Sequence, residues 1–209
     1  MESKPSFDKS ILRKFVRNQG PIVIEIGAHH GEDSEHFLNM FKNCHLYLFE
    51  PDPRCIKKIK EKNLNCELFE GVVSDSTEDV LFFQSSGIFD WDGSGSIATP
   101  KKHKEIFPDI LFKNEILVKS TTLDEYFKGV PFIDLIWMDV QGAERKVFDG
   151  GEETLKKTKC IYTEFCEEEL YEQSPKMEEI LNMLSNFELY GIYEASNVCG
   201  NLFLINKNL

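Results

Sequence analysis

Short apolar runs alternate with amphipathic stretches along the first 75 residues of the chain. Runs rich in branched and aromatic side chains predict strands at 22–26, 45–50 and 66–73, and the stretches between them carry apolar residues at helical spacing. Helical spacing at 6–18 also predicts a helix within the N-terminal residues 1–20, and Asp33 or Ser34 is expected to cap the helix after the first strand. This alternation is typical of a parallel sheet with helices on its faces.

The second half of the chain continues the alternation and ends differently. Strands are predicted at 115–119, 132–139 and 160–165, with short helices after residue 121, on either side of Gly150 and Gly151, and at 175–184. Two aromatic runs joined by a Ser-Asn turn predict a terminal hairpin. We therefore expect an α/β, Rossmann-like fold: one domain over 1–209 with a mostly parallel central sheet, helices on both faces and a C-terminal antiparallel hairpin. The chain is also compatible with being one domain excised from a longer protein.

One segment, residues 85–108, fits neither the strand pattern nor the helix pattern. It contains "SSGIFDWDGSGSIATPKKH", which is rich in Gly and Ser and includes two aromatic residues. Irregular segments of this length in compact domains usually cover a binding site or are disordered. We expect this one to form a loop beside the binding site.

Charge and composition narrow the class of partner. A net charge of −12 argues against a surface that neutralises phosphates, so no nucleic-acid partner is expected. The sequence has no apolar run of membrane-spanning length, and its first ten residues lack the apolar core of a signal peptide, so no membrane partner is expected either. The six cysteines include no C-x-x-C pair and are interpreted as reduced, which indicates a cytoplasmic protein. The sequence does not indicate an oligomeric state.

A glycine turn follows the first predicted strand. In Glu25-x-Gly27-x-x-x-Gly31 the glycines let the backbone approach a ligand, and Glu50 at the end of the next strand can accept hydrogen bonds from two ribose hydroxyls. His29 and His30 in this turn make a zinc site an alternative. Adjacent side chains are expected to diverge, however, and the sequence shows no accompanying Cys/His cluster. We interpret His29 as a turn residue near the cofactor.

The glycine spacing separates two cofactors. A dinucleotide site prefers G-x-G-x-x-G, whereas this turn has three residues between its glycines and an acidic residue, Glu25, before them. A carboxylate there would repel a pyrophosphate and attract an ammonium or sulfonium group, which favours S-adenosylmethionine over NAD. A nicotinamide-dependent oxidoreductase and a cofactor-binding module without catalysis remain the alternatives, and the turn could also serve topology alone.

A second constellation lies at "IDLIWMDVQGAERKVFDGGEETL", where an apolar strand ends at Asp139. Together with "IEIGAHHGEDS", "LYLFEPDP", "TTLDEYF" and "IYTEF", it resembles the FkbM family of S-adenosylmethionine-dependent methyltransferases, which have the class I methyltransferase fold. The resemblance covers nearly the whole chain. It departs from the family pattern at His29, where Asn is typical, and at Gln141, where Glu is frequent.

The resemblance implies O-methylation, often of a sugar or polyketide hydroxyl, and a small-molecule or glycan acceptor. Glu50 would bind the ribose hydroxyls, and Asp139 would stand near both the cofactor and the transferred methyl group. The other residues placed at the cofactor are Glu25, Gly27, Ala28, His29, Gly31 and Ser34 on the methionine and ribose side, and Val73 and Ser74 beside the adenine.

Methyl transfer to a hydroxyl needs a base, because the oxygen loses its proton as it attacks. Asp139 is the first candidate and Glu164 the second; either carboxylate could instead accept hydrogen bonds from a helix N-terminus or the cofactor. The same two carboxylates could hold Mg²⁺ or Mn²⁺. Residues expected at the acceptor are Trp91, which could stack on a sugar ring, Asp92 and Ser94, which could bind its hydroxyls, and Glu144, as an acceptor contact or a structural cap.

Overall fold

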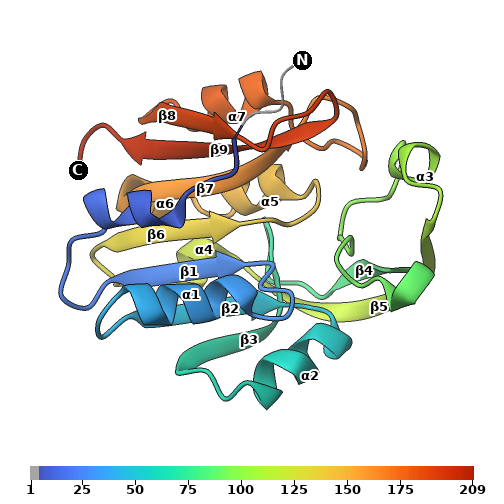
Figure 1. Cartoon of the computed structure of the whole chain (residues 1–209), viewed down its shortest axis with the longest axis horizontal. Helices are drawn as coiled ribbons and strands as arrows, with labels where there is room; N and C mark the ends of the chain where they lie inside the picture. Colours follow the sequence, from blue (N-terminus) through green and yellow to red (C-terminus); the bar gives the residue numbers. More distant parts are fainter. Residues whose placement is uncertain (1–4) are drawn as a thin grey trace.

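A nine-stranded sheet runs through the computed structural model, which describes residues 5–209. The strand order is β4-β5-β3-β2-β1-β6-β7-β9-β8 (Figure 1). The strands are β1 (Ile22–Ile26), β2 (His45–Glu50), β3 (Cys66–Val73), β4 (Val80–Gly87), β5 (Ile110–Thr121), β6 (Ile133–Met138), β7 (Thr158–Cys166), β8 (Phe187–Tyr193) and β9 (Cys199–Asn206).

The middle of the sheet is parallel and both of its edges are antiparallel. Strands β5, β3, β2, β1, β6 and β7 pair in parallel, whereas β4 joins β5, and the β8–β9 hairpin joins β7, in antiparallel pairs. Strand β6 is buried along its whole length, as expected for a central parallel strand covered on both faces. The predicted α/β fold class, with its mostly parallel sheet and C-terminal hairpin, is confirmed.

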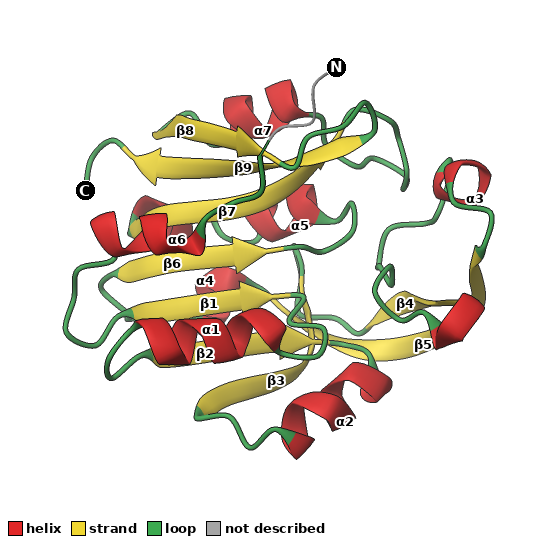
Figure 2. Ribbon diagram, viewed as in Figure 1, coloured by secondary structure: helices red, strands yellow, loops and turns green. Residues whose placement is uncertain are grey.

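Helices cover both faces of the sheet (Figure 2). One face packs against α4, α5, α6 and α7, and the other against η1, α1 and α2. The helices are η1 (Lys9–Lys14), α1 (Glu32–Met40), α2 (Pro53–Glu61), η2 (Ile88–Asp90), α3 (His103–Ile106), α4 (Leu123–Tyr126), α5 (Glu144–Asp149), α6 (Glu152–Lys156) and α7 (Met177–Met183). None of the helices within residues 5–209 is long and apolar enough to cross a bilayer.

The N-terminal segment differs from the helix predicted within 1–20. It contains a 3₁₀ helix of six residues, begun by Asp8, whose side chain accepts a hydrogen bond from the Ser10 N–H. Leu12 is fully buried, and the centroid of the Phe7 ring lies 4.9 Å from that of the Tyr162 ring on the same face of the sheet. Packing of these side chains on the sheet surface therefore overrides the helical spacing. Residues 1–4 of the predicted helix lie outside the described residues.

Three further predictions need correction. Helix α1 begins at Glu32 after Gly31, which has φ +73°, and neither Asp33 nor Ser34 caps it. The segment 85–108 is also less irregular than predicted, because β4 extends to Gly87 and the short helices η2 and α3 lie inside the segment. Strand β5 likewise begins at Ile110, earlier than the predicted 115, because it pairs with the extended β4.

The strand order switches sides at β1, since β2 and β3 are added on one side of it and β6 and β7 on the other, all parallel to it. In open α/β sheets, ligands bind in the crevice beyond the carboxyl ends of the strands at such a point. The residues that leave β1 and β6 at this edge are Gly27 and Asp139.

Candidate functional site

Two cavities meet at the carboxyl ends of β1 and β6. The first, of about 370 Å³, is bordered by Glu50, Val73 and the segment 91–97. The second, of about 360 Å³, is bordered by Glu25, Ala28 and Glu194. Gly27, His29 and Asp139 line both cavities, so these three residues mark the junction.

Glu50 forms the floor of the first cavity. Its carboxylate accepts hydrogen bonds from the backbone N–H groups of His29 and Asp52, both at 2.8 Å. Burial raises the pKa of Glu50 to about 8, although these two bonds favour the ionised form. Each carboxylate oxygen has a second lone pair, so the side chain keeps acceptor capacity for a diol.

The apolar part of the first cavity suits an aromatic base. Phe49 and Val73 line it together with Gly71, where an added Cβ would lie 2.5 Å from the Lys119 backbone oxygen. Ser74 follows Val73 but does not line the cavity, because its N–H donates to the Thr121 carbonyl and its hydroxyl donates to Asp75.

The second cavity is bordered by five acidic residues, Glu25, Glu32, Asp33, Asp139 and Glu194. Glu25 is buried on β1, where the Ser34 hydroxyl donates to it at 2.5 Å. Burial raises the pKa of Glu25 to about 8, against the effect of this hydrogen bond. Glu32, Asp33 and Glu194 lie on the wall of the cavity, with Lys9 as a nearby cation. Ser34, which donates to Glu25, lines neither cavity. Gly31 does not line either cavity.

Three carboxylates cluster beside the junction. Oxygen atoms of Asp139, Glu144 and Glu164 lie within 4.8 Å of one another. The Gln141 amide donates to Asp139 at 2.7 Å and to Glu164 at 3.4 Å. Asp139 is open to the cavities but otherwise surrounded by protein, and this dehydration raises its pKa. Burial also raises the pKa of Glu144 to about 7 and that of Glu164 well above its usual range.

The segment 91–97 forms a wall of the first cavity, so Trp91, Asp92 and Ser94 lie at the same cavity as Glu50. The Trp91 indole donates to the Ser94 hydroxyl at 2.9 Å, and Tyr171 donates to the Ser94 carbonyl at 2.7 Å. The Trp91 side chain remains 47% exposed, so one of its faces is available to a ligand. Glu144, in contrast, is buried away from both cavities.

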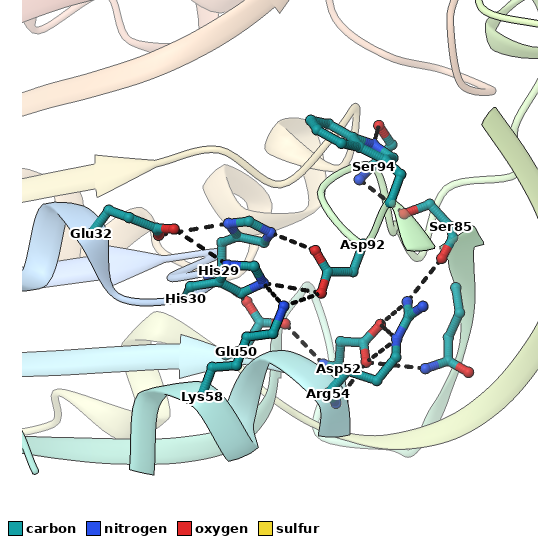
Figure 3. Close-up of polar contacts among 12 residues, drawn as sticks. His29, His30, Glu32, Glu50, Asp52, Arg54, Lys58, Ser85, Asp92 and Ser94 are labelled. Carbon is teal, nitrogen blue, oxygen red and sulfur yellow. Dashed lines mark hydrogen bonds and ion pairs between the residues drawn. The ribbon is translucent and has the colours of Figure 1, made fainter. Parts of the chain in front are cut away.

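The two histidines of the turn do not diverge, contrary to the prediction. Their rings stack with centroids 3.6 Å apart, and both Nε2 atoms lie within 3.0 Å of the Asp92 carboxylate (Figure 3). The conformation of His29, with φ +50°, turns its side chain toward the segment 91–97. The expectation that adjacent side chains diverge therefore fails here, because Asp92 from a distant segment binds both rings.

Three residues of this region were not identified from the sequence. Lys58 donates to Asp92 at 2.9 Å, and Arg54 donates to the Ser85 carbonyl at 2.8 Å, so α2 holds both ends of the segment 85–92. The Tyr171 hydroxyl lies 3.1 Å from the amide oxygen of Gln141, a residue that the sequence marked only as a departure from the family pattern. The only sequence signal was the position of "PDPR" directly after Glu50, since Lys58 and Tyr171 lie in stretches without a motif.

Comparison with known proteins identifies relatives over most of the chain. Residues 25–191 match the Methyltransferase FkbM domain. The 2-O-methyltransferase NoeI of Sinorhizobium fredii (strain NBRC 101917 / NGR234) is 38% identical over 218 residues, which cover 99% of this chain and 89% of NoeI.

Solved structures share the fold at low sequence identity. An rRNA methylase from Streptococcus thermophilus superposes with a TM-score of 0.53 at 11% identity, covering 94% of this chain and 92% of the other. The plantazolicin methyltransferase BpumL in complex with SAH superposes with a TM-score of 0.54 at 10% identity, covering 94% and 80%.

Proposed function

The chain belongs to the FkbM family of S-adenosylmethionine-dependent methyltransferases, and we propose that it methylates a hydroxyl of a sugar or glycan. Membership of this family indicates S-adenosylmethionine as the cofactor instead of NAD. The relative NoeI is a 2-O-methyltransferase, which agrees with an oxygen acceptor. The observation that carries the proposal is the junction at Asp139, where a cavity suited to a nucleoside meets a cavity suited to an ammonium group.

The residues present fit S-adenosylmethionine. Glu50 would accept from the ribose hydroxyls, while Phe49 and Val73 would flank the adenine. Glu25, Gly27 and Ala28 would line the methionine side, where the acidic wall matches an ammonium group. This arrangement would place the sulfonium near Asp139, because only the junction is shared by both cavities.

S-adenosylmethionine supplies an electrophilic methyl group on a sulfonium. When bound, it would give up this methyl group to the acceptor oxygen, and a side chain of the protein, acting as a base, would take up the hydroxyl proton. We assign Asp139 as this base, because it faces the junction and burial raises its pKa, which makes it a stronger base than an ordinary carboxylate. Glu164, which shares Gln141 with Asp139, is the second candidate.

The clustered carboxylates also suit a divalent cation, as a finer form of the same proposal. Asp139, Glu144 and Glu164 offer three oxygen ligands within 4.8 Å of one another, a donor set that Mg²⁺ or Mn²⁺ prefers. Such an ion would neutralise their mutual repulsion and hold the acceptor oxygen near Asp139. Activity would then require the added metal and would be lost in EDTA.

The acceptor side is assigned to the segment 85–108. The exposed face of Trp91 suits the apolar face of a sugar ring. Asp92 and Ser94 already have partners in the turn and in Trp91, so they hold the segment in place and would meet the acceptor only after exchanging those bonds. The net charge of −12 argues for a small-molecule or glycan acceptor over a nucleic acid.

The test is mass spectrometry of a glycan panel incubated with labelled S-adenosylmethionine, with and without EDTA. Asp139→Ala should reduce turnover by roughly 100-fold or more while calorimetry still detects S-adenosylhomocysteine binding. Asp149→Asn, an exposed carboxylate on α5, is the matched control and should leave both unchanged.

Unchanged turnover in Asp139→Ala would remove Asp139 as the base. Cofactor binding without methylation of any sugar would contradict the proposed acceptor and would support a binding module without catalysis.

A further inference from the structure

Four side chains beside the first cavity carry the donor atoms of a transition-metal site. These are the imidazoles of His29 and His30, the thiol of Cys55 and the carboxylate of Asp92, and one donor atom from each lies within 4.8 Å of all the others. They come from three places in the fold: His29 and His30 from the turn after β1, Cys55 from helix α2 and Asp92 from the segment 91–97; Figure 3 shows the two histidines and Asp92. Nitrogen, sulfur and oxygen donors in this mixture favour Zn²⁺ over Mg²⁺ or Ca²⁺.

The outer nitrogens of both rings have a carboxylate partner. The Nδ1 atoms of His29 and His30 lie 3.6 and 3.3 Å from Glu32, on the side of the rings opposite Asp92 (Figure 3). In metal sites, a histidine that binds through one nitrogen usually donates its other N–H to a carboxylate, which fixes the tautomer and the ring orientation. Both rings thus have Nε2 toward Asp92 and Nδ1 toward the Glu32 carboxylate, which would move closer to accept a hydrogen bond from the His29 ring.

The two polar contacts of the His30 Nε2 atom cannot both be hydrogen bonds at the same time. The Nε2 of His30 lies 2.7 Å from the Lys58 ammonium and 3.0 Å from Asp92. A single ring nitrogen can accept from Lys58 or donate to Asp92, but it cannot do both at once. The Lys58 ammonium, 46% exposed, therefore stands as the cation between groups that would otherwise converge on a metal.

The charges balance when an ion replaces Lys58. A divalent cation is neutralised by the Cys55 thiolate and the Asp92 carboxylate, and the exposed Lys58 ammonium can turn to solvent. The Cys55 thiol must lose its proton to bind, and burial raises its pKa, so the metal has to drive this ionisation. The rings have room to tilt out of their stack toward one ion, because their side chains are 35% and 21% exposed.

We infer that His29, His30, Cys55 and Asp92 form a four-coordinate structural site for Zn²⁺. The site is separate from the carboxylate cluster at Asp139 and does not depend on the proposed acceptor. Its ion would join the segment 91–97 to the turn whose His29 N–H donates to Glu50, and so fix that wall of the cofactor cavity.

The experiment titrates the full chain, freed of metal with a chelator, with Co²⁺ and then Zn²⁺. We expect one Co²⁺ ion per chain with tetrahedral absorption and a thiolate-to-cobalt charge-transfer band, and any ion held by the carboxylate cluster would lack this band. Cys55→Ser should remove that band, and His30→Ala should weaken Zn²⁺ binding at least tenfold. Glu32→Gln should weaken it by about 10- to 100-fold, as expected for the carboxylate partner of a ligand. Because the Glu32 side chain is 59% exposed, this variant tests the site without endangering the fold.

Control variants separate this site from other metal binding. Cys66→Ser and His36→Ala change the same residue types outside the cluster and should bind as the wild type does. Glu164→Gln, in the carboxylate cluster, should keep the charge-transfer band. Lys58→Met should bind Zn²⁺ more tightly, because it removes the competing cation.

Two outcomes would overturn the inference. One is wild-type binding that is no tighter than that of the Glu32→Gln and His30→Ala variants. The other is a Co²⁺ complex without a band from sulfur. In either case the cluster would be a salt-bridged contact of the loop, and Lys58→Met would then loosen the segment 91–97 instead of tightening metal binding.

Discussion

A Cβ atom added to Gly27 would lie 1.9 Å from the backbone oxygen of Asp139. The backbones of the turn after β1 and of the residue after β6 are therefore in direct contact, and only a hydrogen atom on the Gly27 Cα fits between them. The same contact places the Asp139 side chain at the junction of the two cavities. The first glycine of the motif is therefore required for the packing of the protein backbone, whether or not a cofactor is bound.

Gly27→Ala should destabilise the fold by more than its backbone angle alone explains. The φ of Gly27 is +81°, and that of Gly129 is +80°, but a Cβ on Gly129 would meet nothing within 4 Å. Gly129→Ala should cost about 1–2 kcal/mol for the left-handed conformation. Gly27→Ala should cost this and on the order of 2 kcal/mol more for the displaced backbone. Urea unfolding of both variants measures the difference, and equal losses would show that the contact relaxes freely.

Cofactor binding should release a proton from Glu50. The pKa of Glu50 is raised to about 8 in the free protein, and hydroxyl groups that donate to the carboxylate lower it. Affinity for S-adenosylhomocysteine should therefore rise with pH up to about 8 and then level off. At about pH 7, the calorimetric enthalpy should vary with the ionisation enthalpy of the buffer.

Glu50→Gln is the variant that assigns this proton. It should weaken binding by roughly 10- to 100-fold, the value of a hydrogen bond to a charged group, and remove the buffer dependence. Glu70→Gln, at the position on β3 paired with Glu50 and exposed, should change neither. Buffer dependence that persists in Glu50→Gln would assign the proton to another group.

The buried Glu25 should make the free protein less stable as pH rises. Its pKa is raised to about 8 in the folded state, so between about pH 4.5 and 8 the folded chain binds more protons than the unfolded chain. The stabilisation from this group is fully present below the unfolded pKa and is lost as pH rises through the folded value.

Glu25→Gln keeps an oxygen for the Ser34 hydroxyl and removes the ionisation. Relative to the wild type, it should gain on the order of 1–3 kcal/mol between about pH 5 and pH 8.5, measured by urea unfolding at both values. The exposed Glu35→Gln on α1 provides the control. Parallel pH curves for Glu25→Gln and the wild type would mean that Glu25 is ionised in the folded state.

The Tyr171 hydroxyl should stabilise the wall of the first cavity. It is buried and donates to the Ser94 carbonyl, whereas the Tyr126 hydroxyl donates to the exposed Glu67 at 2.7 Å. Tyr171→Phe should cost about 1–3 kcal/mol because it leaves buried acceptors without a partner, and Tyr126→Phe should cost less than that. Hydrogen exchange should accelerate in residues 91–97 in the Tyr171 variant. Protection that is unchanged there would mean that other contacts hold the segment.

Two substitutions of Trp91 separate stacking from hydrogen bonding. Trp91→Phe keeps an aromatic face and loses the bond to Ser94, whereas Trp91→Ala loses both. If the ring stacks on the acceptor sugar, Trp91→Ala should raise KM for the acceptor by roughly fivefold or more, and Trp91→Phe should raise it less. If both variants keep the wild-type KM for the acceptor, the acceptor does not bind at Trp91.

Much of the fold follows from local periodicity. The alternation of apolar runs locates most of the strands, and the parallel topology brings Gly27, Glu50 and Asp139 to one edge, because the carboxyl ends of parallel strands meet there. Regular spacing fails at the N-terminus, where Phe7 and Leu12 pack on the sheet and a 3₁₀ turn replaces the predicted helix.

Contacts across irregular segments could not be predicted. Asp92 reaches His29 from 63 positions away, in a segment with no period to fix where its side chain points. The Tyr171 contact with Ser94 spans 77 positions and begins in an acidic loop without a motif. The Ser34 hydroxyl shows a subtler limit, because its position suited a helix cap and its partner is a carboxylate on the neighbouring strand.

The wall formed by residues 91–97 links two parts of the protein that are far apart along the chain. It borders the same cavity as Glu50, and its Asp92 contacts His29, whose backbone N–H donates to the Glu50 carboxylate. A change in the contacts of Asp92 would therefore reach the proposed ribose site through a single residue.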